Sequence, residues 1–438
     1  MNHRKRLPSY GFLALLAYMP FHIFLSQSLS LMTGRLNAWK IAKDIILFLL
    51  VGVALFMAWR QRVRDAVFWR VVLFGVAYGL IHLLVWALNP RIYQETAFEG
   101  IVYNNRLLFF AILGMGAVYT NREWITERRL IKLTLIISTI VCVFGVAQYF
   151  LPKDMLTHVG YSIERGVKPA FFIDDKPDFP RIMSTLRDPN SLGAFLLVPL
   201  CMLYGLFMKF KAEAAKRNKI IALTLLHLVA LLLTFSRGAW GGAFVAMVAC
   251  VFFVGREKFR LTKRMLVVAA GIAVLLGGSL YMLRDQRTVQ NIIQHSDETT
   301  VAAKDSNALH LDFAAQALKD IADKPQGHGP GTAGIVSIRN PNGGQLTENY
   351  YVQLLYEVGV VGFAVFAYAV VYVMRKLKGT TSLLGASLFA AGIAYACMGM
   401  LMHIWSNEAV AAQWWLLGGA AVALGVPVRN TGRQRVHK

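Results

Sequence analysis

Residues 233–240 read Leu233-Thr234-Phe235-Ser236-Arg237-Gly238-Ala239-Trp240, a short polar turn between two apolar runs. The run before it covers residues 220–234 and the run after it covers residues 239–254, so the turn is predicted to join two membrane-spanning helices and to hold Arg237 at the membrane surface. An arginine is costly in lipid and is retained where it faces a polar cavity, an anionic head group or a partner charge. Arg237 is therefore the first candidate for a functional residue.

Apolar runs of similar length recur along the whole chain of 438 residues. Hydrophobic residues make up 56% of the sequence and charged residues 16%, and a run of about 20 apolar residues crosses the hydrocarbon core of a bilayer. The sequence predicts an all-α polytopic membrane protein with a single domain, residues 1–438. The four cysteines lie inside apolar runs, where they behave as small hydrophobes and do not suggest a metal site.

The apolar runs define twelve predicted spans, near residues 10–32, 41–59, 68–88, 104–119, 130–150, 190–208, 219–235, 238–254, 265–283, 348–374, 382–402 and 411–427. Lysine and arginine collect at both termini and in every second connection, as they do in cytoplasmic loops. These connections contain residues 60–64, 122–129, 211–217, 256–264 and 375–378. The alternation predicts that both termini are cytoplasmic.

The formal net charge of +22 arises mainly from these short basic clusters. Clusters of this kind are topology signals and contacts for anionic lipid. Membrane lipid is therefore an expected partner, and nucleic acid is not.

The opposite, outer side of the membrane is predicted to receive the long connections. The largest is residues 284–347, between the ninth and tenth spans, where apolar residues at helical spacing predict an amphipathic helix over residues 309–321 that ends at Asp323-Lys324-Pro325. The glycine-rich run 327–334 follows a helix and not a strand, so it does not indicate a dinucleotide-binding fold.

Three motifs share the outer side. The first is the loop 180–193, in which Pro189-Asn190 is expected to cap the next span; the second is the Ser236-Arg237-Gly238 turn. The third opens the tenth span with Glu348-Asn349-Tyr350 and continues to Glu357-Val358-Gly359-Val360-Val361-Gly362. In this order the motifs resemble the O-antigen ligase and polymerase superfamily, whose members carry a Pro-Asn loop, a Ser-Arg-Gly turn and a helix with Asn-Tyr and Glu-x-Gly-x-x-Gly. The resemblance covers residues 180–365.

The resemblance implies a C-type glycosyltransferase of the bacterial inner membrane. Such an enzyme moves a glycan from an undecaprenyl-pyrophosphate donor to an acceptor sugar on the outer face, without a nucleotide sugar, a metal or another cofactor. We expect an O-antigen ligase, whose acceptor is lipid A-core. A polymerase, whose acceptor is another lipid-linked glycan, is the alternative within the superfamily. A transporter is the alternative from another class of protein. A transporter is expected to have paired, broken helices near the membrane midplane and corresponding segments in the two halves of its sequence, and this sequence shows neither feature.

The resemblance also implies roles for individual residues. Arg181 and Arg237 match the arginines that the family uses for the leaving pyrophosphate, and a guanidinium group can bind phosphate oxygens bidentately. Arg187, Asn190 and Asn349 are further candidates for substrate contacts. Each arginine can instead have a role without substrate. Arg237 can be an anchor whose side chain reaches the lipid head groups, Arg181 can be a solvated loop residue, and Arg187 can pair with Asp188.

Two residues are candidates for the group that takes the proton of the acceptor hydroxyl. The family's ligases carry a histidine immediately before the asparagine that opens the tenth span, and here that residue is Glu348. Either Glu348 is the base, or Glu348 orients the acceptor sugar while His328 takes the proton from the glycine-rich run. Glu348 can also act only as a favourable charge at its helix start, and His328 only as a turn residue.

Overall fold

The computed structural model describes residues 7–173, 176–254, 316–345, 347 and 349–426. The first half contains α1 (Leu7–Tyr18), η2 (Met19–Phe21), α2 (His22–Thr33), α3 (Leu36–Arg60), α4 (Ala66–Ala87), α5 (Gln94–Thr120), α6 (Glu127–Phe150) and η3 (Met155–Val159). Then follow β1 (Phe171–Ile173), β2 (Lys176–Arg181), α7 (Pro189–Phe195), α8 (Leu197–Phe210), α9 (Ala214–Leu233), α10 (Arg237–Phe253), α14 (Gly334–Ser337), α15 (Tyr350–Lys378), α16 (Leu383–Met398) and α17 (Glu408–Gly425).

The predicted all-α polytopic membrane fold is confirmed. Seven described helices are long and apolar enough to cross a membrane: Leu7–Thr33, Leu36–Arg60, Ala66–Ala87, Gln94–Thr120, Glu127–Phe150, Pro189–Phe210 and Tyr350–Lys378. Two shorter apolar helices, α10 and α16, and the helices α9 and α17 occupy further predicted spans. The predicted ninth span and most of the predicted loop 284–347 lie outside the described residues.

Several helix boundaries differ from the prediction, and two of them bear on the site. The helix α5 begins at Gln94 and not near residue 104, because its first turns are polar and do not raise the local hydropathy. The helix α16 ends at Met398 and α17 begins at Glu408, so the connection between them covers residues 399–407 and not 403–410 as expected. Residues 316–323 are helical at the end of the predicted amphipathic helix, and Ala317 and Ile321 pack against Val352 of α15. This end of the predicted helix therefore packs against α15.

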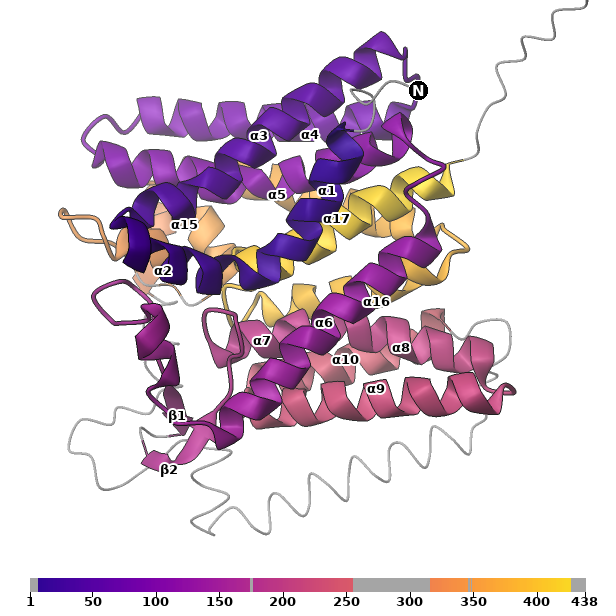
Figure 1. Ribbon diagram of the computed structural model, residues 1–438. Helices are drawn as coiled ribbons and strands as arrows, with labels where there is room; N and C mark the ends of the chain where they lie inside the picture. Colours follow the sequence, from indigo (N-terminus) through magenta and orange to yellow (C-terminus); the bar gives the residue numbers. More distant parts are fainter. Residues whose placement is uncertain (1–6, 174–175, 255–315, 346, 348, 427–438) are drawn as a thin grey trace, which may run out of the picture.

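The helix α17 forms the centre of the bundle. Figure 1 shows it between α3, α4 and α5 on one side and α6, α8, α9 and α10 on the other. It packs closely on α5 because glycines meet backbone there: a Cβ atom on Gly114 would overlap the carbonyl oxygen of Leu416, and one on Gly419 would overlap that of Ala111. Small residues at such positions allow membrane helices to approach closely.

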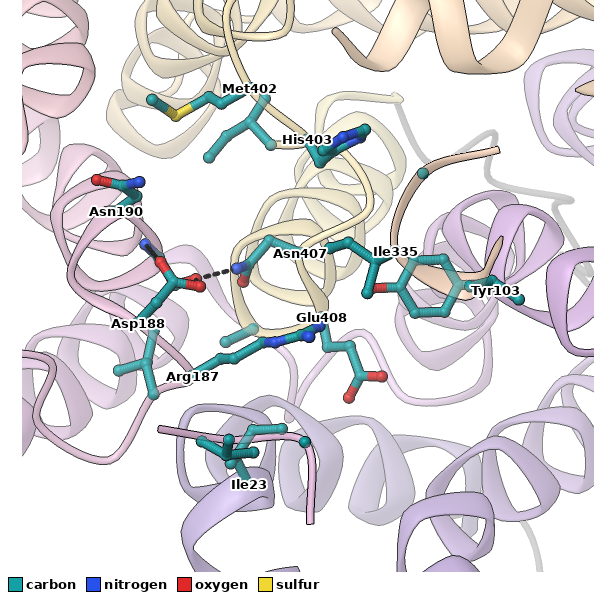
Figure 2. A pocket seen from close by; sticks show the side chains of 18 of the residues that line it. Ile23, Tyr103, Arg187, Asp188, Asn190, Ile335, Met402, His403, Asn407 and Glu408 are labelled. Carbon is teal, nitrogen blue, oxygen red and sulfur yellow. Dashed lines mark hydrogen bonds between the residues drawn. The ribbon is translucent and has the colours of Figure 1, made fainter. Parts of the chain in front are cut away.

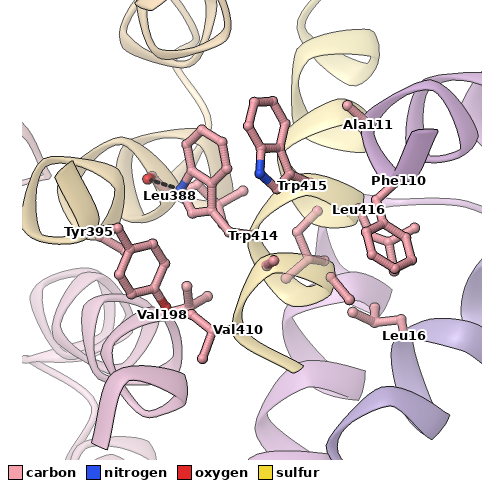
Figure 3. Close-up of a cluster of buried hydrophobic side chains, with 14 of the residues drawn as sticks. Leu16, Phe110, Ala111, Val198, Leu388, Tyr395, Val410, Trp414, Trp415 and Leu416 are labelled. Carbon is pink, nitrogen blue, oxygen red and sulfur yellow. Dashed lines mark hydrogen bonds between the residues drawn. The ribbon is translucent and has the colours of Figure 1, made fainter. Parts of the chain in front are cut away.

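Large aromatic side chains fill the space beside α17 (Figure 3). Trp414 and Trp415 are fully buried and meet edge to face, and Trp414 Nε1 donates a hydrogen bond of 2.9 Å to the carbonyl oxygen of Leu388 in α16. The hydroxyl of Tyr395 donates one of 2.9 Å to the carbonyl oxygen of Ala194 in α7. Both polar groups are thus satisfied inside the core, as buried indole and phenol groups usually are.

Candidate functional site

A cavity of about 2420 Å³ is lined by residues of α2, α3, α5, α7, α10, α14 and α17 and of the connections between them (Figure 2). Its wall contains residues of all three motifs: Arg181, Arg187 and Asn190 from the first, Arg237 from the second and Asn349 from the third. In the described part of the chain its charged lining comprises nine Lys or Arg residues (Lys40, Lys43, Arg106, Arg165, Lys168, Arg181, Arg187, Arg237, Arg339) and six carboxylates (Asp44, Glu95, Glu99, Glu164, Asp188, Glu408). The excess of positive charge favours an anionic ligand.

Arg181 joins the first motif to the second. Its Nε donates a hydrogen bond of 2.9 Å to the carbonyl oxygen of Thr234, and an Nη donates one of 3.1 Å to Oδ1 of Asn190. The next backbone N–H, that of Ile182, donates to the carbonyl oxygen of Leu233 at 3.1 Å. The loop that carries Arg181 is therefore fastened directly to the turn that carries Arg237.

The helix α7 is capped by Asp188 and not by Asn190 as expected. Oδ1 and Oδ2 of Asp188 accept hydrogen bonds of 2.8 Å from the backbone N–H and the hydroxyl of Ser191. Pro189 is the first helical residue, a position where its missing N–H costs nothing. Because Asp188 takes the capping role, the side chain of Asn190 is available to hold Arg181.

The Ser-Arg-Gly turn is tight and well anchored. Phe235 has a φ of +46°, which is the left-handed conformation that lets the chain reverse between α9 and α10. Ser236 caps α10 by accepting a hydrogen bond from the N–H of Ala239, and Trp240 Nε1 donates back to the carbonyl oxygen of Leu231 at 3.0 Å. Arg237, the first residue of α10, is thereby held at the cavity wall.

The third motif begins α15 and contacts the connection 399–407. Oδ1 of Asn349 caps the helix by accepting from the N–H groups of Tyr351 and Val352, and its Nδ2 donates to the carbonyl oxygen of Met400 at 2.9 Å. Glu348 lies outside the described residues, so its role as a base stays a prediction.

His328, the other predicted base, is not among the residues that line the cavity. Its ring stacks on Tyr356 with centroids 4.1 Å apart, and its backbone N–H donates to the carbonyl oxygen of Tyr356 at 2.8 Å. Partial burial and the positive charge of Lys324 lower the pKa of His328 below its ordinary value. The structure therefore brings together the arginines and asparagines of the predicted site, but not His328.

The glycine-rich run serves close packing against α5. Gly331 has a φ of +72°, and a Cβ atom there would overlap the carbonyl oxygen of Thr96. The carboxylate of Glu357 in α15 holds the same loop, since it accepts hydrogen bonds from the N–H of Ala333 at 3.3 Å and from Nδ2 of Asn104 at 2.8 Å. The Glu-x-Gly-x-x-Gly pattern thus has a structural function here.

A buried ionic network forms part of the cavity wall and was not predicted from the sequence. Glu408 lies 2.8 Å from Arg106, 3.4 Å from Lys43 and 3.1 Å from His22, and Lys43 also lies 2.8 Å from Asp44. These residues come from α2, α3, α5 and α17. Charged residues inside or beside apolar runs are the signal that would have identified Asp44 and Arg106.

His403, which is not among the predicted site residues, lines the cavity from the connection 399–407. Desolvation and the positive charge of Arg187 lower the pKa of His403 to about 4, so its ring is neutral at neutral pH. Figure 2 shows His403 with Arg187, Asn407 and Glu408 around the same space. No group of three or more His, Cys, Asp or Glu side chains with the arrangement of a metal site occurs among the described residues.

Two comparisons with known proteins bear on this site. Residues 222–367, which include the Ser-Arg-Gly turn and the start of α15, match the model of the O-antigen ligase family. Over 305 residues the chain is 16% identical to an O-antigen polymerase of Salmonella muenchen, and this match covers 69% of the chain and 73% of that protein. The two matches agree with the resemblance noted from the motifs, and they support placing the chain in the O-antigen ligase and polymerase superfamily.

Proposed function

We propose that this protein transfers a glycan from an undecaprenyl-pyrophosphate donor to an acceptor sugar, and that the acceptor is lipid A-core, as for an O-antigen ligase. The observation that carries the proposal is the junction between Arg181 and the turn that bears Arg237, through which two guanidinium groups line one large cavity. The match of residues 222–367 to the O-antigen ligase family supports the same reaction class.

The chemistry of transfer suits these arginines. When the bond between C1 of the donor sugar and the pyrophosphate breaks, negative charge develops on the leaving phosphate oxygens. Guanidinium groups that are already oriented stabilise this charge without reorganising during the reaction. Arg181 is oriented by Thr234 and Asn190, and Arg187 adds a further positive charge to the same wall. In this scheme Arg181 and Arg237 bind the pyrophosphate.

The cavity also suits a substrate with a large head group and a lipid tail. Its volume of about 2420 Å³ exceeds the roughly 300–1,000 Å³ of a pocket for a small ligand. Ile41 and Ile45 of α3 and Phe244 of α10 line the cavity and are more than 45% exposed, so its margins are apolar. Such margins let a polyprenyl chain stay in the bilayer while its pyrophosphate and sugars enter the polar interior.

The acceptor hydroxyl must lose a proton as it attacks C1. Glu348 precedes Asn349, which lines the cavity, and we propose that Glu348 contributes to the acceptor side of the site. Glu348 either takes the proton or orients the acceptor sugar.

A polymerase is the second candidate, because the relative from Salmonella muenchen is described as an O-antigen polymerase. The two functions share the donor and differ in the acceptor. Deletion of the gene in the native bacterium, followed by electrophoresis of its lipopolysaccharide, distinguishes them. Loss of the whole O-antigen ladder is expected for a ligase, and a single remaining repeat on lipid A-core would identify a polymerase. An unchanged ladder would contradict both.

A further inference from the structure

The connection 399–407 is held at both ends by the motifs of the site. At its beginning, the carbonyl oxygen of Gly399 accepts a hydrogen bond of 3.1 Å from the N–H of Tyr350, and that of Met400 accepts one of 2.9 Å from Asn349. At its end, Asn407 Nδ2 donates to the hydroxyl of Ser191. The middle of this segment is therefore positioned between the third motif and the first.

His403 occupies this middle position and faces the cavity. Its side chain is only half-buried, while Nδ1 is buried and has no hydrogen-bond partner within the described part of the chain. The other histidine of the described cavity wall, His22, is different. Its Nδ1 contacts the hydroxyls of Tyr18 and Ser26 at 3.1 and 3.2 Å, and its Nε2 lies 3.1 Å from Glu408. Both ring nitrogens of His22 thus contact other side chains of the protein, whereas the ring of His403 can still form a hydrogen bond with a ligand.

We propose that His403 takes the proton from the acceptor hydroxyl during glycan transfer. The proposal rests on the proposed function. In the step, the acceptor oxygen forms a bond to C1 of the donor sugar, and the bond between C1 and the pyrophosphate oxygen breaks with its electron pair staying on the pyrophosphate. The O–H bond of the acceptor breaks, and its proton moves to a ring nitrogen of His403. The products are the extended glycan and undecaprenyl pyrophosphate.

The charges around His403 fit this role. With its lowered pKa the ring is neutral at neutral pH, so it has a lone pair ready to accept a proton. Burial and the positive charge of Arg187 both disfavour the resulting imidazolium; the negative charge of a bound pyrophosphate offsets the charge of Arg187 and so raises the proton affinity of the ring. The base therefore becomes effective when the donor is present.

The test uses membranes of a deletion strain that contain the full-length protein and the strain's own lipid-linked glycan and lipid A-core. The variants are His403→Ala and His403→Gln. The matched control is His158→Ala, because His158 is an exposed histidine of η3 that does not line the cavity. Loss of a general base is expected to lower the rate of transfer by about 100-fold or more in both His403 variants. The control is expected to transfer at the wild-type rate.

Added imidazole separates a proton acceptor from a structural residue. The His403→Ala variant leaves space beside a cavity that is large enough for imidazole, so free imidazole is expected to restore part of the activity. The restored activity should be higher at pH 8 than at pH 6, because more of the imidazole is protonated at pH 6 and cannot accept a proton. Wild-type rates in His403→Ala, or a slow variant that imidazole does not restore, would overturn the proposal. If the wild-type membranes themselves show no transfer, it is the proposed function that fails.

Discussion

Arg106 of α5 donates a hydrogen bond to Glu408, the first residue of α17, with a distance of 2.8 Å between Nη1 and Oε1. Arg106 is only 1% exposed, so this ion pair is largely withdrawn from water. Lys43 and His22 contact the same carboxylate. Because Glu408 follows directly on the connection 399–407, the network fixes the start of α17 together with the segment that carries His403.

Removing one partner of this pair is expected to destabilise the protein. Arg106→Met leaves a buried carboxylate with fewer partners, and we expect a loss of about 3–5 kcal/mol. Adding Glu408→Leu should recover part of it, because Lys43 keeps its pair with Asp44. Thermal unfolding of the purified protein in detergent measures both. The control Arg339→Ala removes an exposed pair with Glu99 and should cost about 0–1 kcal/mol. Equal losses in Arg106→Met and the control would show that burial of the network contributes nothing.

Replacement of Arg181 or Arg237 is expected to lower the rate of transfer while the protein still reaches the membrane. Arg181→Ala and Arg237→Ala each remove a charge-assisted contact worth about 1.5–3 kcal/mol, which corresponds to roughly 10- to 150-fold in transfer. Arg→Lys should restore little, since an ammonium group cannot reproduce the guanidinium fork. Lipopolysaccharide electrophoresis and the amount of protein in the membrane are measured together. Normal ladders in both Arg→Ala variants would contradict the proposed pyrophosphate site.

Glu348→Gln is expected to act on acceptor binding. If Glu348 orients the acceptor sugar, the amide keeps the shape and loses the charge, so KM for the acceptor should rise about tenfold, with a smaller change in kcat. His403→Ala should show the opposite pattern, with a large fall in kcat and a smaller change in KM for the acceptor. Steady-state transfer at varied acceptor concentration checks this. A fall in kcat alone for Glu348→Gln would return the role of the base to Glu348.

Gly331 in the glycine-rich run and Gly343, which follows that run, offer a matched pair of substitutions. Gly331 and Gly343 both have positive φ values, +72° and +82°, but only at Gly331 would a Cβ atom meet neighbouring backbone. Both changes to Ala should incur a conformational cost of about 1–2 kcal/mol, and Gly331→Ala should add an overpacking cost of about 1–3 kcal/mol. Thermal unfolding in detergent compares them. Equal stability of the two variants would indicate that the loop does not need its close approach to α5.

The predicted topology is tested with single engineered cysteines. Cys397 is the exposed native cysteine among the four, so Cys397→Ala is the background. Asn342→Cys lies in the predicted outer segment and Lys216→Cys in a predicted cytoplasmic loop, and both positions are exposed. A membrane-impermeant thiol reagent, applied to cells with a permeabilised outer envelope and an intact inner membrane, should label only the cysteine at position 342. Equal labelling at both positions would contradict the alternation of the loops.

The sequence by itself determined the fold class and the motifs. The length of an apolar run and the turn residues that end it are local properties, so the positions of the helices could be predicted from them. The positions of Arg237 and Asn349 at the ends of helices were visible in the same way, whereas Arg181, which was expected in a loop, ends the strand β2, which was not predicted. The polar first turns of α5 were not, because hydropathy does not register a helix that continues beyond its apolar part.

Only the tertiary structure decided which of these residues meet. The hydrogen bond from Arg181 to Thr234 spans 53 positions in the chain and that from Arg106 to Glu408 spans 302, and no periodicity encodes such contacts. The same holds for His328 and His403, whose sequence surroundings do not say which ring faces the cavity. Packing of α17 on α5 and the anchoring of residues 399–407 bring His403 to the wall, while stacking on Tyr356 holds His328 away from it, because side-chain position depends on the neighbours that the fold supplies.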